Sequence, residues 1–106
     1  MSELPRVSEQ LEYLVNTDEV FGQLRGRVKA LEYRMKVAEA VGYMESEGTQ
    51  EMRKAQARCS DKYKAMLDEY QQACIEMHTI EARRNTAALQ IEVWRSQQAN
   101  RRSGNI

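Results

Sequence analysis

The sequence predicts an all-α fold, an antiparallel helical hairpin in which a long C-terminal helix overhangs its partner. Three observations predict it. The stretch from Thr49 to Ser103 runs 55 residues without Gly or Pro, enough for one helix of about 80 Å. Apolar residues before it recur at steps of 3 and 4, and the two stretches are joined at Gly48. The pattern is typical of two helices packed lengthwise in a coiled-coil-like pair.

We expect one domain, residues 1–106, with three parts. Residues 1–17 form an N-terminal segment with Ser8 as a possible helix cap, and Asn16-Thr17 break the run. The first helix spans 18–46, and its seam is Phe21, Leu24, Val28, Leu31, Met35 and Ala38. Gly22 and Gly26 lie one turn apart on it. They indicate either close approach of another backbone or local fraying, and we favour close approach.

The turn is Glu47-Gly48-Thr49, where Gly48 can end one helix in the left-handed conformation and Thr49 can cap the next. The second helix then spans 49–102. Its apolar seam begins with an eleven-residue unit and then continues at alternating steps of 3 and 4. We expect the extra residues of the first unit to unwind the supercoil locally without ending the helix. The seam is Met52, Ala55, Cys59, Tyr63, Met66, Tyr70, Ala73, Met77, Ile80, Arg84, Ala87, Ile91 and Trp94. Pairing within one chain and domain swapping through the turn would bury the same residues.

The overhang is the predicted partner-binding site. If the chain folds back near Gly48, residue 18, the start of the first helix, lies opposite about residue 77 of the second helix. The apolar seam of the second helix nevertheless continues beyond residue 77. The N-terminal segment, a partner molecule or both would cover it. Arg84 interrupts the seam with a charge that either pairs with a carboxylate or reaches solvent. The predicted partner-binding residues are Ile80, Arg84, Ala87, Ile91 and Trp94.

Charge offers an alternative function. The chain has zero formal net charge, but residues 78–106 carry five arginines against two glutamates, whereas residues 1–47 carry three more acids than bases. A basic end next to Trp94 can bind phosphates and stack on bases. The predicted nucleic-acid contacts are Arg83, Arg95, Arg101 and Arg102.

Catalytic and metal sites are not predicted. The single histidine, His78, has Cys74 one turn away, and no further His or Cys completes a metal site. No phosphate-binding glycine loop, carboxylate pair or nucleophile motif is present, so we expect no enzyme activity, cofactor or small-molecule substrate. Cys59 and Cys74, about 22 Å apart on one helix, predict free thiols. With no apolar run long enough to span a bilayer, we expect a soluble protein of the cytoplasm and no membrane partner.

Residues 32–106 resemble a group of small all-helical accessory proteins of tailed phages, often encoded near recombination and replication genes. The residues that carry the resemblance are Lys36-Val37-Ala38, Gly48-Thr49, Arg53, Ala57-Arg58, Tyr63, Tyr70 and Ile91-Glu92-Val93-Trp94-Arg95-Ser96. The resemblance implies a non-catalytic accessory role in the host cytosol during phage growth. We therefore expect a protein that self-associates or binds a protein partner through its long C-terminal helix. The alternatives are a DNA-binding accessory protein of recombination or replication, and an inhibitor of a host protein.

Overall fold

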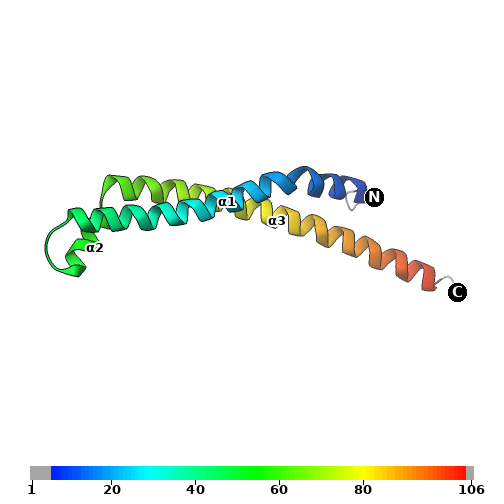
Figure 1. Ribbon diagram of the computed structural model, residues 1–106. Coiled ribbons are helices and arrows are strands. Elements are labelled where there is room, and N and C mark those ends of the chain that lie inside the picture. The colour runs from blue at the N-terminus through cyan, green and yellow to red at the C-terminus, as the bar shows by residue number, and fades with distance from the viewer. Residues whose placement is uncertain (1–5, 105–106) are drawn as a thin grey trace. The chain divides into compact units, whose positions relative to one another are not determined.

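The computed structural model describes residues 6–104, which form three helices (Figure 1). These are α1 (Val7–Glu45), α2 (Gln50–Arg58) and α3 (Asp61–Gly104), and the described residues include no strand. The long helices α1 and α3 pack against each other, so the predicted all-α hairpin is confirmed. Among the described residues the fold has two compact units. The first unit is 6–22 with 78–104, and the second unit is 23–77.

In the second unit, the predicted seam is where the core forms. Val28 and Leu31 of α1 pack with Ala73 of α3, and Met66, Tyr70, Cys74 and Met77 pack around them. Leu31 is 1% exposed and is the largest fully buried side chain among the described residues. Large residues of α1 face small Ala73, so the two backbones can approach closely along a thin apolar seam.

Helix α1 begins at Val7, so the predicted bounds of 18–46 were wrong at the N-terminal end. Asn16 and Thr17 do not break the helix. The Thr17 hydroxyl donates to the carbonyl of Tyr13 at 2.7 Å, one turn back in the same helix. Ser8 lies inside the first turn rather than at a cap, and Arg6 supplies the first accepting carbonyl. The segment expected to be separate is therefore the first part of α1.

The turn residues behave as predicted. Gly48 has a φ of +113°, a conformation that L side chains rarely adopt. Thr49 caps α2, and its hydroxyl accepts from the backbone N–H of Met52 at 3.2 Å. Side-chain contacts then hold α2 against the end of α1. The Arg53 Nε donates to the Tyr43 carbonyl at 3.1 Å, and its guanidinium lies 4.3 Å from the centre of the Tyr43 ring.

A break at Cys59–Ser60 divides the helix that was predicted to run unbroken from 49 to 102. The hydroxyl of Ser60 accepts from the backbone N–H of Tyr63 at 3.2 Å, so Ser60 caps α3. The predicted seam is also wrong in α2, because Met52, Ala55 and Cys59 are exposed. Ala57 is the buried residue there. The eleven-residue unit marked a change of helix rather than a local unwinding.

Arg58, at the end of α2, forms an ion pair with α1 in the second unit. Its Nε donates to Glu39 Oε2 at 2.7 Å. This hydrogen bond, with the nearby negative charge of the carboxylate, raises the pKa of Arg58 above its ordinary value. Both cysteines are free, as predicted, and Cys59 is exposed.

Close backbone approach occurs at Gly42 and not at the two glycines predicted for it. A Cβ added at Gly22 or Gly26 would meet nothing within 4 Å, so those glycines do not serve close packing within the chain. A Cβ at Gly42 would lie 3.0 Å from both Cα and Cβ of Ala57. The contact of α2 with α1 therefore depends on the absence of a side chain at Gly42.

We expect Gly42→Ala and Gly26→Ala to change stability in opposite directions. Both remove a glycine from the interior of α1, which alone would stabilise the helix by about 0.5–1 kcal/mol. At Gly42 the added methyl group also has to displace the backbone of α2, at a cost of about 1–3 kcal/mol. Urea unfolding of the two variants measures the difference directly. Equal stability would show that α2 does not pack on α1 at Gly42.

Candidate interaction surface at the end of α3

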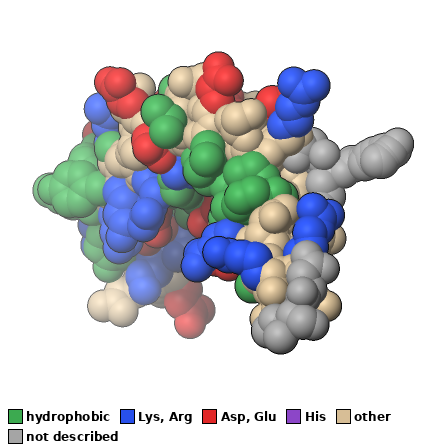
Figure 2. All heavy atoms as spheres, turned by 90° about the vertical axis from the view of Figure 1, so that its right-hand side faces the viewer, with side chains coloured by type: hydrophobic (Ala, Val, Ile, Leu, Met, Phe, Trp, Pro, Cys, Tyr) green, Lys and Arg blue, Asp and Glu red, His purple; other side chains and the backbone are tan. Residues whose placement is uncertain are grey.

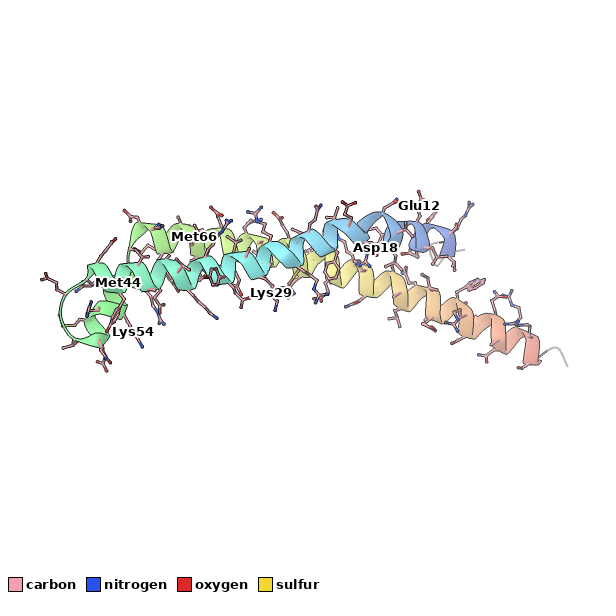
Figure 3. The ribbon with its side chains drawn as sticks, in the orientation of Figure 1. Glu12, Asp18, Lys29, Met44, Lys54 and Met66 are labelled. Atoms are coloured by element: carbon pink, nitrogen blue, oxygen red, sulfur yellow. The ribbon has the colours of Figure 1, made fainter. Side chains whose placement is uncertain are left out.

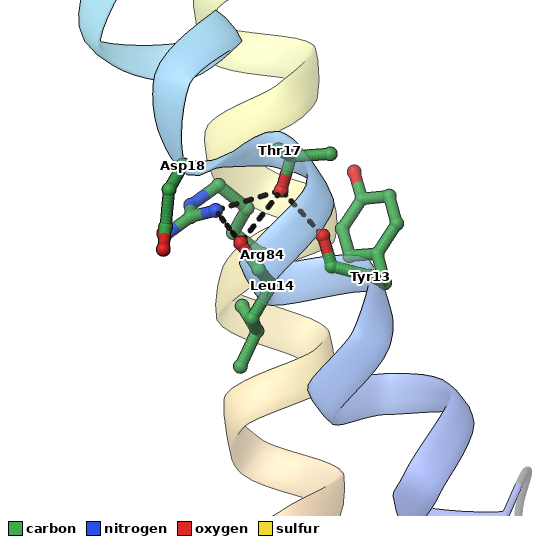
Figure 4. Close-up of polar contacts among 5 residues, drawn as sticks. All are labelled: Tyr13, Leu14, Thr17, Asp18 and Arg84. Carbon is green, nitrogen blue, oxygen red and sulfur yellow. Dashed lines mark hydrogen bonds and ion pairs between the residues drawn. The ribbon is translucent and has the colours of Figure 1, made fainter.

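Arg84, the charged residue of the predicted seam, is bound by α1 in the first unit (Figure 4). Its Nη1 donates to the Leu14 carbonyl at 2.8 Å and to the Thr17 hydroxyl at 2.7 Å. Its Nη2 lies 2.6 Å from Asp18 Oδ1. The Phe21 ring lies under the guanidinium, 5.2 Å from centroid to Cζ. Four residues of α1 thus contact the single Arg84 side chain of α3.

This arrangement decides between the two interpretations of Arg84. Its side chain is 19% exposed, and its charge is matched by Asp18, whose side chain is 64% exposed. Arg84 is thus paired across a helix–helix contact, and the contact is within the chain. A guanidinium that donates to three acceptors costs less to bury partly than an unpaired one, and it favours the one alignment of α1 and α3 that supplies these acceptors.

Three further residues of the predicted partner site also belong to the seam of the first unit. Ala87 is 2% exposed, so its surface is already covered within the chain. Ile80 and Ile91 are half-buried. The predicted overhang is therefore shorter than expected, because residues before 18 are helical and reach Arg84.

Beyond Ala87 the cover of α3 decreases. Trp94 lies two turns further along the same seam and is 42% exposed, and Leu89 and Val93 are exposed beside it. Trp94 also lines a shallow depression of ≈ 320 Å³ whose other residues all come from α3: Glu92, Arg95, Ser96, Gln98, Ala99 and Arg102. We call Leu89, Ile91, Val93, Trp94 and Arg95 the α3 end surface.

The first unit also exposes apolar side chains on α1. Leu11, Val15 and Val20 are each more than 40% exposed. Leu89 and Trp94 of the α3 end surface are exposed to a similar or greater extent. Figure 2 shows hydrophobic side chains in several groups among charged and other polar side chains, rather than one wide apolar face. The sequence periodicity did not predict that Leu11 and Val15 lie exposed on α1, because residues 1–17 were expected to be separate from that helix.

The arginines predicted to contact nucleic acid are spread over α3. Arg83 is exposed next to Arg84 but makes none of its contacts with α1. Arg95 Nη1 lies 2.8 Å from Glu92 Oε1, so part of its charge is matched within the helix. Arg101 and Arg102 are in the last turn, where cations interact favourably with the helix dipole. These four residues are not gathered into one patch.

No group of three or more His, Cys, Asp or Glu side chains among the described residues could hold a metal ion. Within residues 6–104, no helix combines the length and apolar character needed to cross a membrane. Comparison of the chain with protein-family models, curated proteins and solved structures finds no match. The resemblance to helical phage proteins therefore stays a prediction.

Proposed function

We propose that the chain is a non-enzymatic interaction protein whose α3 end surface binds a second copy of the chain. The observation that supports this proposal is the exposure of Trp94 on the same seam that buries Ala87. Trp is among the residues that contribute most to binding energy at interfaces, and an apolar side chain left in water on a helix seam favours association. Ile91 and Trp94 would be the anchors.

Charge supports a second copy as the occupant. Within the first unit, α1 exposes Glu9 and Glu12 in its first turns, and α3 exposes Arg101 and Arg102 in its last turn. Each copy thus carries both partners of a possible charge pair. That self-complementarity is what a two-fold symmetric interface requires. The accessory role during phage growth that the resemblance implies is compatible with such a module.

We expect the wild-type chain to have twice the mass of one chain in light scattering, and Ile91→Ala with Trp94→Ala to have the mass of one chain. The doubly substituted protein should keep its helical circular dichroism, because the two side chains are not in the core of the second unit. A wild-type monomer at all concentrations would contradict the proposal.

The matched control is Ile75→Ala with Tyr33→Ala, which removes one Ile and one aromatic residue from exposed positions in the second unit. This control should leave the mass unchanged. If it abolishes association as fully as the substitutions in the α3 end surface, the interface lies elsewhere. A partner of another kind, such as the host protein of the inhibitor alternative, would leave the wild-type chain monomeric.

A further inference from the structure

A second surface, in the second unit, carries a higher density of charge than the end of α3. Residues 25–36 of α1 contain five bases, and Glu32 is the single acid among them. On this stretch Val28 and Leu31 are buried, and all five bases are exposed. Since the apolar residues face α3, the cations lie on the flanks and the outward side of the helix, and Lys29 projects from α1 in Figure 3.

We propose that this side of α1 binds single-stranded nucleic acid. We call Arg27, Lys29, Tyr33, Arg34 and Lys36 the α1 basic face. The proposal goes beyond self-association, because it concerns a different helix face in a different unit and does not require a dimer.

The spacing of the cations fits a phosphate backbone running along the helix. Arg27 and Arg34 are seven residues apart on one flank, and Lys29 and Lys36 are seven apart on the other, so each pair spans about 10.5 Å of helix axis. Beside the two arginines the surface is low. Gly26 has no side chain, and a Cβ added there would meet no other atom within 4 Å. Ala30, one turn later, has only a methyl group.

A groove marks this position. An open depression of ≈ 510 Å³ lies along the flank with the two arginines, and its lining residues are Gln23, Gly26, Arg27, Ala30, Leu31, Arg34 and Glu69. The low surface at Gly26 and Ala30 lets a polymer backbone come close, while the two guanidiniums can each bind a phosphate with two donors. Glu69 is an acid at its edge, on α3 of the same unit, and it should oppose phosphate binding.

The charges of the four cations are available. Within residues 6–104, no ion pair is recorded for a residue of the α1 basic face. Glu32 partly offsets Lys36, since both line a smaller depression with Glu39. The two arginines and Lys29 therefore carry most of the expected attraction to an anion.

Tyr33 distinguishes a single strand from other polyanions. Its side chain is 69% exposed, and it lies one turn from Lys29 and from Lys36 on the outward side of α1. An exposed aromatic ring among cations is the combination that binds single strands, in which a base stacks on the ring while the cations bind the backbone. An acidic protein or an anionic bilayer would use the charges without needing the ring, and a duplex keeps its bases stacked.

The test is fluorescence anisotropy of a labelled mixed-sequence strand of about 20 nucleotides, in DNA and RNA forms, at about 50 and 200 mM salt. Arg27→Gln with Arg34→Gln should weaken binding at least tenfold and lower the slope of log affinity against log salt by about 1.4, since each lost contact to a single strand removes about 0.7. The matched control is Lys62→Gln with Lys64→Gln, which removes the same charge from exposed positions of α3 in the same unit. It should change the affinity less than twofold.

Two further variants test the assigned roles. Tyr33→Ala should weaken binding at least fivefold at an unchanged salt slope, and Tyr33→Phe should bind like the wild type, because the ring and not the hydroxyl stacks. Glu69→Gln should strengthen binding. Circular dichroism confirms the fold of each variant, and light scattering shows that the arginine substitutions leave self-association intact.

The proposal is overturned by no binding at the lower salt concentration or by equal effects of the arginine and lysine pairs. Tighter binding of a duplex of the same length, or of vesicles of anionic phospholipid, would equally overturn it. None of these outcomes bears on the mass of the wild-type chain, so the failure of nucleic-acid binding and the failure of self-association are distinguishable.

Discussion

Leu31→Ala is expected to lower the free energy of unfolding by about 2–5 kcal/mol, the range for removing a fully buried leucine. Leu31 is 1% exposed, and its partners in the core of the second unit are Val28 and Ala73. Ala73 is too small to fill the space left by the lost isobutyl group, and the helices cannot close it without moving the larger side chains around it. A cavity therefore adds to the lost burial.

Urea unfolding followed by circular dichroism measures this change. Leu11→Ala is the matched control, because it makes the same chemical change at an exposed position of α1 outside the α3 end surface and should alter stability by less than about 0.5 kcal/mol. Equal midpoints for the two variants would show that α1 and α3 do not pack through Leu31. A loss confined to Leu31→Ala shows that a thin seam supplies much of the stability of the second unit.

The fold class and the seam could be predicted from the sequence because both depend on local periodicity. The positions from Phe21 to Ala38 are spaced at 3 and 4, and each is buried or half-buried in the structure. The start of α1 could not be predicted this way. The same spacing continues upstream through Gln10 and Thr17, but these are polar, and hydropathy does not count them as seam residues. The role of Thr17 becomes visible only once Arg84 is placed against α1.

The break between α2 and α3 has a similar cause. The absence of Gly and Pro from Thr49 to Ser103 permits one helix but does not require it. Ser60 followed by Asp61 is a helix-start signal, and the change of seam spacing falls at the same place. In the structure Ala57 of α2 is buried close to Gly42 of α1, a contact that the seam spacing after Thr49 does not indicate.

The candidate sites were predictable only in part. Trp94 lies exposed where the sequence predicts an uncovered seam, whereas Arg84 and Ala87 are used within the chain. The α1 basic face was missed because charge was summed over residues 1–47, where nine acids outnumber six bases and so hide the local excess of bases in 25–36. A shorter window, taken together with the burial of Val28 and Leu31, would have found it.

Arg84→Ala is expected to release the first part of α1 while leaving the second unit folded. The substitution removes three hydrogen bonds that join α3 to Leu14, Thr17 and Asp18, and the one to Asp18 is also an ion pair. Hydrogen bonds to a charged group contribute about 1.5–3 kcal/mol, and the pairing with exposed Asp18 adds little because water screens it. We expect amide protection in residues 7–18 to fall by about 10–100-fold, as local opening becomes easier by that free energy.

Hydrogen exchange resolved by residue measures this effect, with the Leu31 amide as an internal reference in the second unit. Arg83→Ala is the matched control, because it removes the same charge and side chain one position away, where the residue is exposed. Arg84→Met separates the two ways in which Arg84 can act, since it keeps an alkyl chain of similar length but has no donors. If Arg84→Met protects residues 7–18 as well as the wild type does, packing of the alkyl chain holds α1 in place. If it loses protection as Arg84→Ala does, the donors to Leu14 and Thr17 hold it.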